Sequence, residues 1–546
     1  MINLKTIFLK KEFYHEIVMV ILLFLAAFLY FSYGYNYLNV RVYHYEEGIV
    51  AHAATFILNG GILYRDFFIH EFPGQYYLQA AVFKILGTNL HVMRIFAMVV
   101  LSLLTCLIYI GLKKFTRKAI AFLGFFLILA WLKANILYGR APQTATLFAI
   151  LSCFAMIKFI YSGRNSLLII TGIFAGITTL FRQDFGFYTF IALFMVLFLH
   201  QLESYEYKNW MVCFKSVFIK TFYLLLGIIL AILPLVSYFI KIGILKEFTD
   251  YTIIFPLEVL IKRQLFTFPH LTFSNVVFYF PPVIFLLAFL KLLKSKWNTK
   301  NNDYKRDLCL MLFTLSGIGF FNYFRFHYNI THFIYTMVFA IIISMLLLED
   351  SLRNRRFKYP IFERAIDVAV LLISTAVLFY PIISVFRQVK IASQKESMID
   401  INRARGFYDN SQMAQSQALA IRYIQDKTSP EEKIFVGNSK HDRVVVGDSI
   451  FYFLAERNSA TKYCRIDIGT TFKDRQEEII KDIKKNNARY IVLCSVFTDD
   501  IDLYGSFRSS GINDLDIFIQ ENYKVEKIFG PYTILKRKIN FNQPQS

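Results

Sequence analysis

Long apolar stretches recur along most of this chain and restrict its fold more than any other feature. About eleven of them occur before residue 387, each with about the 16–25 residues that a helix needs to cross a bilayer. Inside a bilayer every backbone N–H and C=O group must be bonded within the protein, so only helices and closed barrels can cross it. The sequence therefore predicts a multi-pass α-helical membrane protein. Its expected spans are residues 15–34, 91–112, 118–135, 142–161, 166–181, 185–200, 217–240, 275–293, 307–322, 331–349 and 363–387.

The composition agrees with this class of protein. Of the 546 residues, 56% are hydrophobic, and 60 basic residues outnumber 39 acidic ones to give a net charge of +21. In a soluble protein such a charge would first indicate a nucleic-acid partner. Here Lys and Arg concentrate in alternate short loops, as the positive-inside rule predicts for cytoplasmic loops, so we expect no nucleic acid. With a cytoplasmic N-terminus, an odd number of spans places the residues after 387 outside.

Two segments on the outer side are long enough to carry structure. In the first, residues 35–90, Glu46 to Asn59 has the apolar spacing of an amphipathic helix. Tyr76 to Leu86 is too short to cross the bilayer and starts with the tyrosines that are typical of the membrane interface. The second segment, residues 241–274, holds prolines and many aromatic residues. We expect it also to lie along the outer membrane surface.

The hydrophobic pattern changes after about residue 395. Helical spacing at Ser411–Lys427 and Lys473–Lys485 alternates with apolar, strand-like runs at Lys433–Gly437 and Ala488–Ser495. Such alternation predicts a small α/β domain of about 150 residues with a largely parallel sheet. Val525–Phe529 and Tyr532–Lys536 are expected to form a hairpin-like pair at its end.

The chain is thus divided into a membrane domain, residues 1–390, and a soluble extracytoplasmic α/β domain, residues 391–546. If the second domain lies outside the cell, Cys464 and Cys494 could pair in a disulfide. Its glycines form neither a dinucleotide-binding motif nor a phosphate-binding loop, so no nucleotide site is assigned to it.

Ionisable residues gather at the span ends that should face the outer side. They are Glu46, Glu47, Arg65, Asp66, His70, Arg140, Arg182, Asp184, Arg325, His327 and His332. Charged groups at membrane depth are costly, so a one-sided collection of them indicates a functional site. Each also has an ordinary explanation: acids stabilise a helix N-terminus, adjacent Arg–Asp pairs form weak surface ion pairs, and arginines at span ends extend to the headgroups.

Taken together, these residues put a carboxylate and several cations on one face beside lipid. Such a site suits a substrate with a phosphate head and a membrane-buried tail. The carboxylate would deprotonate an acceptor hydroxyl, and the Arg and His side chains would neutralise the charge that develops on a phosphate leaving group. The chemistry predicted from the residues alone is group transfer from a lipid phosphate.

The motifs that carry these residues resemble a known superfamily. The first outer loop of the bacterial GT-C glycosyltransferases, relatives of the protein mannosyltransferases and lipid A aminoarabinose transferases, is similar to Tyr45-Glu46-Glu47-Gly48, Asn59-Gly60-Gly61, Tyr64-Arg65-Asp66-Phe67-Phe68 and Pro73-Gly74. Further similarity is seen in Ile85-Leu86-Gly87 with Arg94, Phe181-Arg182-Gln183-Asp184 and the turn from Arg325 to His332. The resemblance implies sugar transfer from a polyprenyl-phosphate sugar, usually with inversion. The acceptor would be a lipid, glycan or protein of the cell envelope, outside the bacterial cytoplasmic membrane.

The resemblance also implies roles for single residues. Glu46 stands where the family has Asp, Glu47 stands at the family's Glu, and either is implied as the general base. The implied phosphate or sugar contacts are Arg65, His70, Arg182, Arg325 and His332, with Asp66 and Asp184 orienting their Arg neighbours. Phe72-Pro73 replaces the family's paired prolines. No compact DxD motif occurs, so no obligatory cofactor is expected, and a divalent metal stays open.

Other classes of function remain as alternatives. A lipid or polysaccharide transporter commonly has internal repeats and coupling residues near the bilayer midplane, whereas the charged residues here lie at span ends. A scaffold without catalysis would only anchor the C-terminal domain. An O-antigen polymerase or ligase is a nearer alternative, which would use a diphosphate lipid. Only an enzyme needs a carboxylate as a base, so Glu-to-Gln substitution separates it from the transporter and the scaffold.

Overall fold

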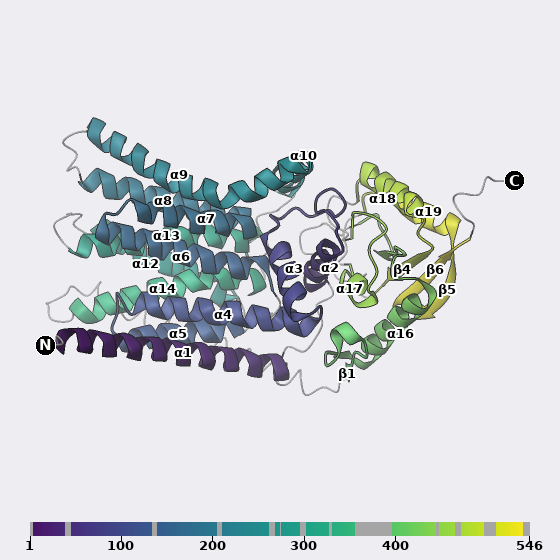
Figure 1. The fold of residues 1–546 in the computed structure, drawn as a ribbon, viewed down its shortest axis with the longest axis horizontal. Coiled ribbons are helices and arrows are strands. Elements are labelled where there is room, and N and C mark those ends of the chain that lie inside the picture. Colours follow the sequence, from purple (N-terminus) through teal and green to yellow (C-terminus); the bar gives the residue numbers. More distant parts are fainter. Residues whose placement is uncertain are drawn as a thin grey trace.

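The computed structural model describes residues 4–38, 45–133, 139–204, 210–260, 268–272, 275–294, 302–326, 330–354, 396–443, 447–464, 471–495 and 509–538. A bundle of long helices makes up most of the molecule, and a smaller part with both helices and strands lies at one end of it (Figure 1). The N-terminus lies at the opposite end of the bundle from this smaller part.

The bundle contains the helices that the apolar stretches predicted. They are α1 (Leu4–Leu38), α4 (Leu90–Leu112), α5 (Lys118–Lys133), α6 (Ala141–Ser162), α7 (Ser166–Phe181), α8 (Gln183–Ser204), α9 (Trp210–Lys241), α12 (Phe280–Lys294), α13 (Asn302–Phe326) and α14 (Ile330–Asn354). Among the described residues, 8 helices are long and apolar enough to cross a membrane, while α5 and α7 are apolar but shorter. The expected span at 363–387 lies outside the described residues. The predicted multi-pass helical class is confirmed, and the count of eleven spans is not.

Burial separates the centre of the bundle from its edge. The apolar part of α14 is 89% buried, whereas those of α1 and α9 are only 17% buried. We infer that α14 is a central helix and that α1 and α9 present their side chains to lipid. Helix α9 is held against α7 by close glycine contact, since a Cβ atom on Gly172 would lie 2.0 Å from the carbonyl oxygen of Leu224.

Short helices connect the bundle at the end that faces the smaller part. The loop after α1 holds α2 (Glu46–Leu58) and α3 (Gly74–Leu86), and the later segment holds α10 (Leu245–Thr249), η1 (Asp250–Ile254), η2 (Pro256–Leu260) and η3 (Val276–Tyr279). The predicted helix at Glu46–Asn59 is therefore present. Its residues from Glu47 to Thr55 are all buried, so it has no polar, solvent-facing side. The C-terminal domain covers that side, which the sequence pattern of α2 alone does not reveal.

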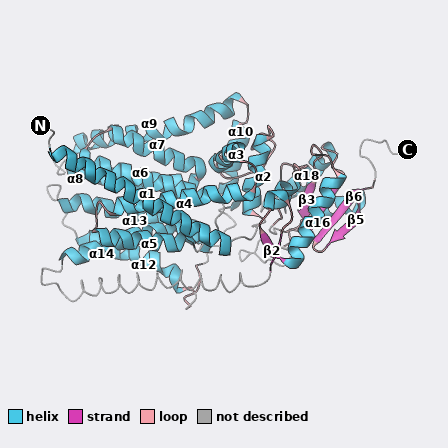
Figure 2. Cartoon of the chain, turned by 60° about the horizontal axis from the view of Figure 1, so that its bottom comes forward, coloured by secondary structure: helices cyan, strands magenta, loops and turns pink. Residues whose placement is uncertain are grey.

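The C-terminal domain, residues 396–538 as described, is the smaller part of the molecule. Its elements are β1 (Glu396–Met398), η4 (Asn402–Ala404), β2 (Tyr408–Asn410), α16 (Ser411–Lys427), β3 (Phe435–Asn438), α17 (Ile450–Ala455), α18 (Lys473–Lys485), β4 (Tyr490–Cys494), α19 (Asp514–Asn522), β5 (Tyr523–Phe529) and β6 (Tyr532–Arg537). Figure 2 shows the described strands confined to this domain, beyond the end of the bundle.

The main sheet has the strand order β3-β4-β6-β5. Only β3 and β4 pair in parallel; β4 with β6 and β5 with β6 are antiparallel. The expected hairpin at Val525–Phe529 and Tyr532–Lys536 is present as β5 and β6, joined by a tight turn at Gly530 and Pro531. The prediction of a largely parallel sheet is wrong, because β6 also pairs antiparallel with β4, which makes the sheet mixed. Cys464 and Cys494 are both buried, and the suggested disulfide between them is not formed.

Helix α2 packs directly against the backbone of α17. Gly48 makes this possible, because a Cβ atom at that position would lie 2.2 Å from the backbone nitrogen of Ile450. One helical turn later, the ring of His52 stacks on that of Tyr452, with centroids 4.7 Å apart. The C-terminal domain is thus in contact with the helix that begins with Glu46 and Glu47.

Substitution of Gly48 by alanine is expected to destabilise this contact by about 1–3 kcal/mol, because the added methyl group meets backbone atoms that cannot turn away. Gly124→Ala is the matched control, since a Cβ atom on that helical glycine would meet only the side chains of Leu112 and Met345. Thermal unfolding of the detergent-solubilised variants measures the difference. Equal midpoints for the two variants would contradict the close packing of α2 on α17.

Candidate functional site

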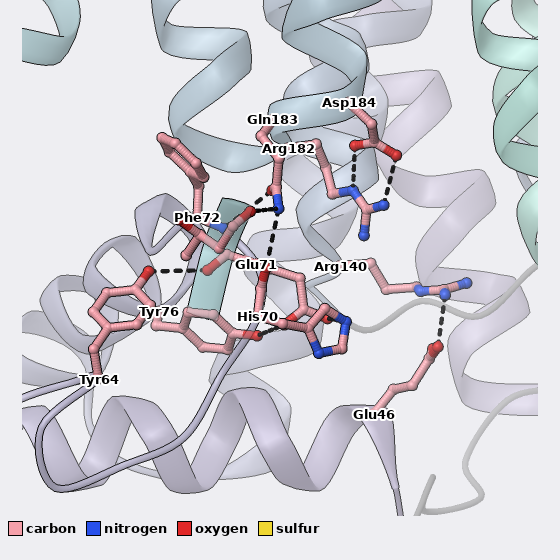
Figure 3. A network of polar contacts seen from close by, with 11 residues as sticks. Glu46, Tyr64, His70, Glu71, Phe72, Tyr76, Arg140, Arg182, Gln183 and Asp184 are labelled. Atoms are coloured by element: carbon pink, nitrogen blue, oxygen red, sulfur yellow. Dashed lines mark hydrogen bonds and ion pairs between the residues drawn. The ribbon is translucent and has the colours of Figure 1, made fainter. Parts of the chain in front are cut away.

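The predicted polar residues meet at the end of the bundle that faces the C-terminal domain. Helices α6, α8 and α14 begin at this end, and α7 and α13 finish there (Figure 1). Their terminal residues therefore surround the start of α2 and the segment from His70 to Phe72. Figure 3 shows the side chains of Glu46, His70, Arg140 and Arg182 directed toward a common region.

Glu46 forms an ion pair with Arg140. Its Oε1 atom accepts a hydrogen bond of 2.8 Å from Nη2 of Arg140, which precedes α6 (Figure 3). Arg140 also donates through Nη1 to the carbonyl oxygen of Thr331, at the start of α14, over 3.4 Å. The Arg140 side chain is 7% exposed, whereas that of Glu46 is 41% exposed. Glu46 is thus held by a buried cation and still open to a substrate.

Glu47 has a different environment, because successive residues of a helix point about 100° apart. Its two carboxylate oxygens accept hydrogen bonds of 2.8 Å from Nε and Nη2 of Arg94 on α4, and both side chains are fully buried. The Arg94 guanidinium also lies over the ring of Phe407, 4.6 Å from its centroid. Glu47 therefore joins α2 to the bundle and to the C-terminal domain.

Arg182 and Asp184 form a second pair, in the turn between α7 and α8. Nε and Nη2 of Arg182 donate to the two carboxylate oxygens over 2.9 and 2.7 Å. This fork geometry holds the guanidinium over the ring of Tyr323, 4.7 Å from its centroid. The ring of His332 lies 4.6 Å from the same tyrosine.

Tyr323 links these groups into one site. Arg182, Arg140 and Glu46 all interact electrostatically with its hydroxyl group. A small cavity borders Arg140, and it is lined by Leu101, Leu132, Arg140, Gln143, Thr331, Ile334 and Tyr335. The structure therefore brings together five predicted residues and one buried tyrosine that sequence reasoning did not select. The predicted five are Glu46, Arg140, Arg182, Asp184 and His332.

The segment from His70 to Phe72 completes the site, and Gln183 holds it. The Gln183 side chain donates to the carbonyl oxygen of His70 over 3.0 Å and accepts from the backbone N–H of Phe72 over 3.2 Å (Figure 3). Glu71 lies 3.3 Å from the His70 ring, accepts a hydrogen bond from Tyr76, and interacts electrostatically with Arg182. Sequence reasoning missed Glu71 and Gln183, although each is adjacent to a residue that it selected.

The remaining predicted site residues lie on the surface or outside the described residues. Arg65 and Asp66 bond to each other on the surface, with side chains 52% and 39% exposed. Arg325 is exposed in the last turn of α13. His327 lies outside the described residues. In the described part of the chain no group of three or more His, Cys, Asp and Glu side chains could hold a metal ion.

His52 is a buried neutral group behind the site. It is 1% exposed, and neither of its ring nitrogens has a hydrogen-bond partner in the structure. Burial, together with the charge of Arg403, lowers the pKa of His52 from 6.5 to about 3. As pH falls below 6.5 the unfolded chain therefore takes up a proton at His52 that the folded chain does not, and the folded state loses stability until pH reaches about 3.

His52→Phe is expected to remove part of this acid sensitivity and to keep the stacking on Tyr452. Between pH 8 and pH 5 the wild type should lose about 2 kcal/mol more stability than the variant. Unfolding midpoints at the two pH values, compared between the proteins, give the difference. The same loss in both proteins would mean that His52 takes up its proton in the folded state.

Comparison with known proteins gives a match to a family model and matches to solved structures. Residues 70–239 match the family model of the dolichyl-phosphate-mannose-protein mannosyltransferases. The whole fold is similar to that of ArnT from Cupriavidus metallidurans, a GT-C aminoarabinose transferase. For the crystal structure of ArnT bound to undecaprenyl phosphate the TM-score is 0.54 at 14% identity, covering 96% of this chain and 99% of ArnT. For the apo structure the TM-score is 0.52 at 13% identity, covering 97% and 100%. A search of curated protein sequences gives no significant match.

Proposed function

Because this chain has the fold of the GT-C membrane glycosyltransferases, we propose that it transfers a sugar from a polyprenyl-phosphate donor to a cell-envelope acceptor. The acceptor is a lipid, glycan or protein, and the reaction takes place at the outer face of the bacterial cytoplasmic membrane. We assign the N-terminus to the cytoplasm and the C-terminal domain to the outside, which the distribution of basic residues supports.

One observation carries the proposal. A partly exposed carboxylate, Glu46, shares one end of the bundle with Arg140, Arg182 and His332, next to the lipid-facing helices. A polyprenyl-phosphate sugar has its charge beside its lipid tail, so an enzyme for it needs cations at the edge of the bilayer. The undecaprenyl phosphate bound by the structural relative ArnT has this chemistry.

Glu46 is assigned as the general base. Its carboxylate takes the proton of the acceptor hydroxyl while the hydroxyl oxygen attacks C1 of the donor sugar. The bond between C1 and the phosphate oxygen breaks, and the electron pair stays on the phosphate. A single displacement of this kind inverts the configuration at C1. The ion pair with Arg140 fixes the position of the carboxylate.

Arg182 is assigned to the leaving phosphate. Asp184 holds the guanidinium by its Nε–Nη2 edge, which leaves Nη1 for a phosphate oxygen. His332, which lies beside Tyr323, and His70 are assigned as further hydrogen-bond donors. Arg65, Asp66 and Arg325 stay predicted substrate contacts. No metal-dependent step is proposed.

The test is sugar transfer by the purified protein in liposomes. Radiolabelled polyprenyl-phosphate sugars and cell-envelope acceptors would be supplied with and without a chelator, and the anomeric configuration of the product would be determined by NMR. We expect donor consumption and an inverted product. If folded protein consumed no donor across a broad panel, a transporter or a scaffold would replace the proposed enzyme.

A further inference from the structure

The segment that carries His70 and Glu71 is held on three sides. The C-terminal domain holds its beginning, because the backbone N–H of Phe68 donates to the carbonyl oxygen of Lys462 over 2.8 Å. Gln183, in the α7–α8 turn, holds its end, and the same Gln183 amide also donates to the carbonyl oxygen of Thr252 over 3.3 Å. The third side is therefore the outer helical segment, which is the run from Leu245 to Leu260 formed by α10, η1 and η2.

Aromatic rings fill the space between these three parts. The buried ring of Phe68 makes edge contacts with Tyr251 and Phe255 of the outer helical segment, at centroid distances of 4.9 and 5.4 Å. On its other side it packs on Tyr463 of the C-terminal domain, 5.2 Å away. Aromatic pairs of this geometry are directional, so a shift of Tyr251 or Tyr463 changes the position of Phe68.

Lys462 joins two of the three parts through its side chain. Its ammonium group donates to the Tyr251 hydroxyl over 2.8 Å and pairs with Glu478 of α18 over 2.6 Å. The Lys462 side chain is 16% exposed and that of Glu478 36% exposed, so this ion pair is partly removed from water. Glu478 in turn accepts a hydrogen bond of 2.6 Å from the Tyr463 hydroxyl. Arg475 of α18 also bonds to the Tyr463 hydroxyl, pairs with Glu478 and lies over the Tyr251 ring. Two cations, Lys462 and Arg475, thus fix both rings that hold Phe68, and Lys462 bonds to both Tyr251 and Glu478.

These contacts form a path from Lys462 to Arg182, the residue assigned to the leaving phosphate. Tyr251 is adjacent to Thr252, whose carbonyl oxygen bonds to Gln183. Gln183 bonds to the backbone on either side of Glu71, and Glu71 interacts electrostatically with Arg182. A change at Lys462 therefore reaches the proposed phosphate site through packed side chains and hydrogen bonds, without contact with substrate.

We propose that Lys462 is a positioning residue, through which the C-terminal domain sets the placement of the His70–Phe72 segment and so the affinity of the site for the lipid phosphate. The inference rests on the proposed function for its ligand. It gives the C-terminal domain a part in the site itself. Lys462 acts through Tyr251 and Phe68.

The test compares Lys462→Met, which keeps the apolar stem, with Lys462→Arg, which keeps the charge. Lys473→Met is the matched control, because Lys473 makes an exposed ion pair with Glu477 in the same domain. Hydrogen–deuterium exchange of peptides covering 66–73, α16 and α18 reports on local order in the full-length protein. The dissociation constant for undecaprenyl phosphate in detergent micelles reports on the site.

For Lys462→Met we expect faster exchange at 66–73, unchanged exchange in α16 and α18, and affinity weakened about tenfold, the effect of one lost charge-assisted hydrogen bond. Lys462→Arg and Lys473→Met should stay close to wild type. Tyr251→Phe removes only the Lys462–Tyr251 hydrogen bond and keeps the ion pair with Glu478, so it should weaken affinity less than Lys462→Met. The double variant should bind no more weakly than Lys462→Met, because that variant has already lost this bond.

Wild-type exchange at 66–73 and wild-type affinity in Lys462→Met would overturn the proposal. Faster exchange throughout α16 and α18 would also overturn it, since Lys462 would then only stabilise its own domain. If wild-type protein did not bind undecaprenyl phosphate at all, the proposed function would fail, whereas the exchange at 66–73 would still show whether Lys462 orders that segment.

Discussion

Glu46→Gln is expected to lower sugar transfer by a factor of about 10²–10⁴, the usual contribution of a general base, while the protein stays folded. The amide oxygen can still accept the hydrogen bond from Arg140, so the local geometry should be kept. The amide cannot take the proton of the acceptor hydroxyl. Initial rates in liposomes, with the donor that wild-type protein consumes, measure the effect.

The control for this experiment is Glu477→Gln, which removes an exposed carboxylate on α18 and should leave the rate unchanged. Thermal unfolding of each variant verifies that folding is equal. A Glu46→Gln rate within twofold of wild type would rule out Glu46 as the base. It would also direct attention to Glu71, the carboxylate of the His70–Phe72 segment.

Glu47→Gln should act in a different way, through stability. It leaves the Arg94 guanidinium without its carboxylate inside the protein, and breaking a buried ion pair in this manner costs about 3–5 kcal/mol. We expect a much lower unfolding midpoint in detergent. Any loss of sugar transfer should follow the loss of folded protein.

A double variant separates this structural role from catalysis. Glu47→Leu with Arg94→Met removes both charges and fills a similar volume, so much of the stability should return. Transfer by the double variant at low temperature should then exceed that of Glu46→Gln. If the double variant were stable and still inactive, Glu47 would have a part in the reaction beyond holding α2.

Much of the fold could be predicted because the determining signals are local. Apolar length gave the positions of ten helices in the bundle, and helical spacing gave α16 and α18 with the bounds that the structure has. The hairpin of β5 and β6 was predicted from its short connection, but the antiparallel pairing of β6 with β4 was not, because β6 inserts between β4 and β5. Pairing between strands depends on contacts that no single strand encodes.

The site shows the same division between local and distant signals. Pairs that are close in sequence, such as Arg182 with Asp184, were anticipated and are present. The partners of the two adjacent acids were not: Glu46 pairs with Arg140 and Glu47 with Arg94, residues on two different helices. The sequence left open which of the two acids is the base. In the structure the Glu47 side chain is fully buried, whereas that of Glu46 is 41% exposed. The covering of α2 by α17 was missed because its two halves are some 400 residues apart.

The packing of α2 also implies an order of events during synthesis of the chain. Helix α2 leaves the ribosome well before the residues that enclose it, among them Phe407, Ile450 and Tyr452, because these come much later in the chain. A nascent chain therefore has Glu46 long before α2 is covered. Insertion of the spans can proceed with α2 still uncovered, and its final packing waits until the C-terminal domain has folded.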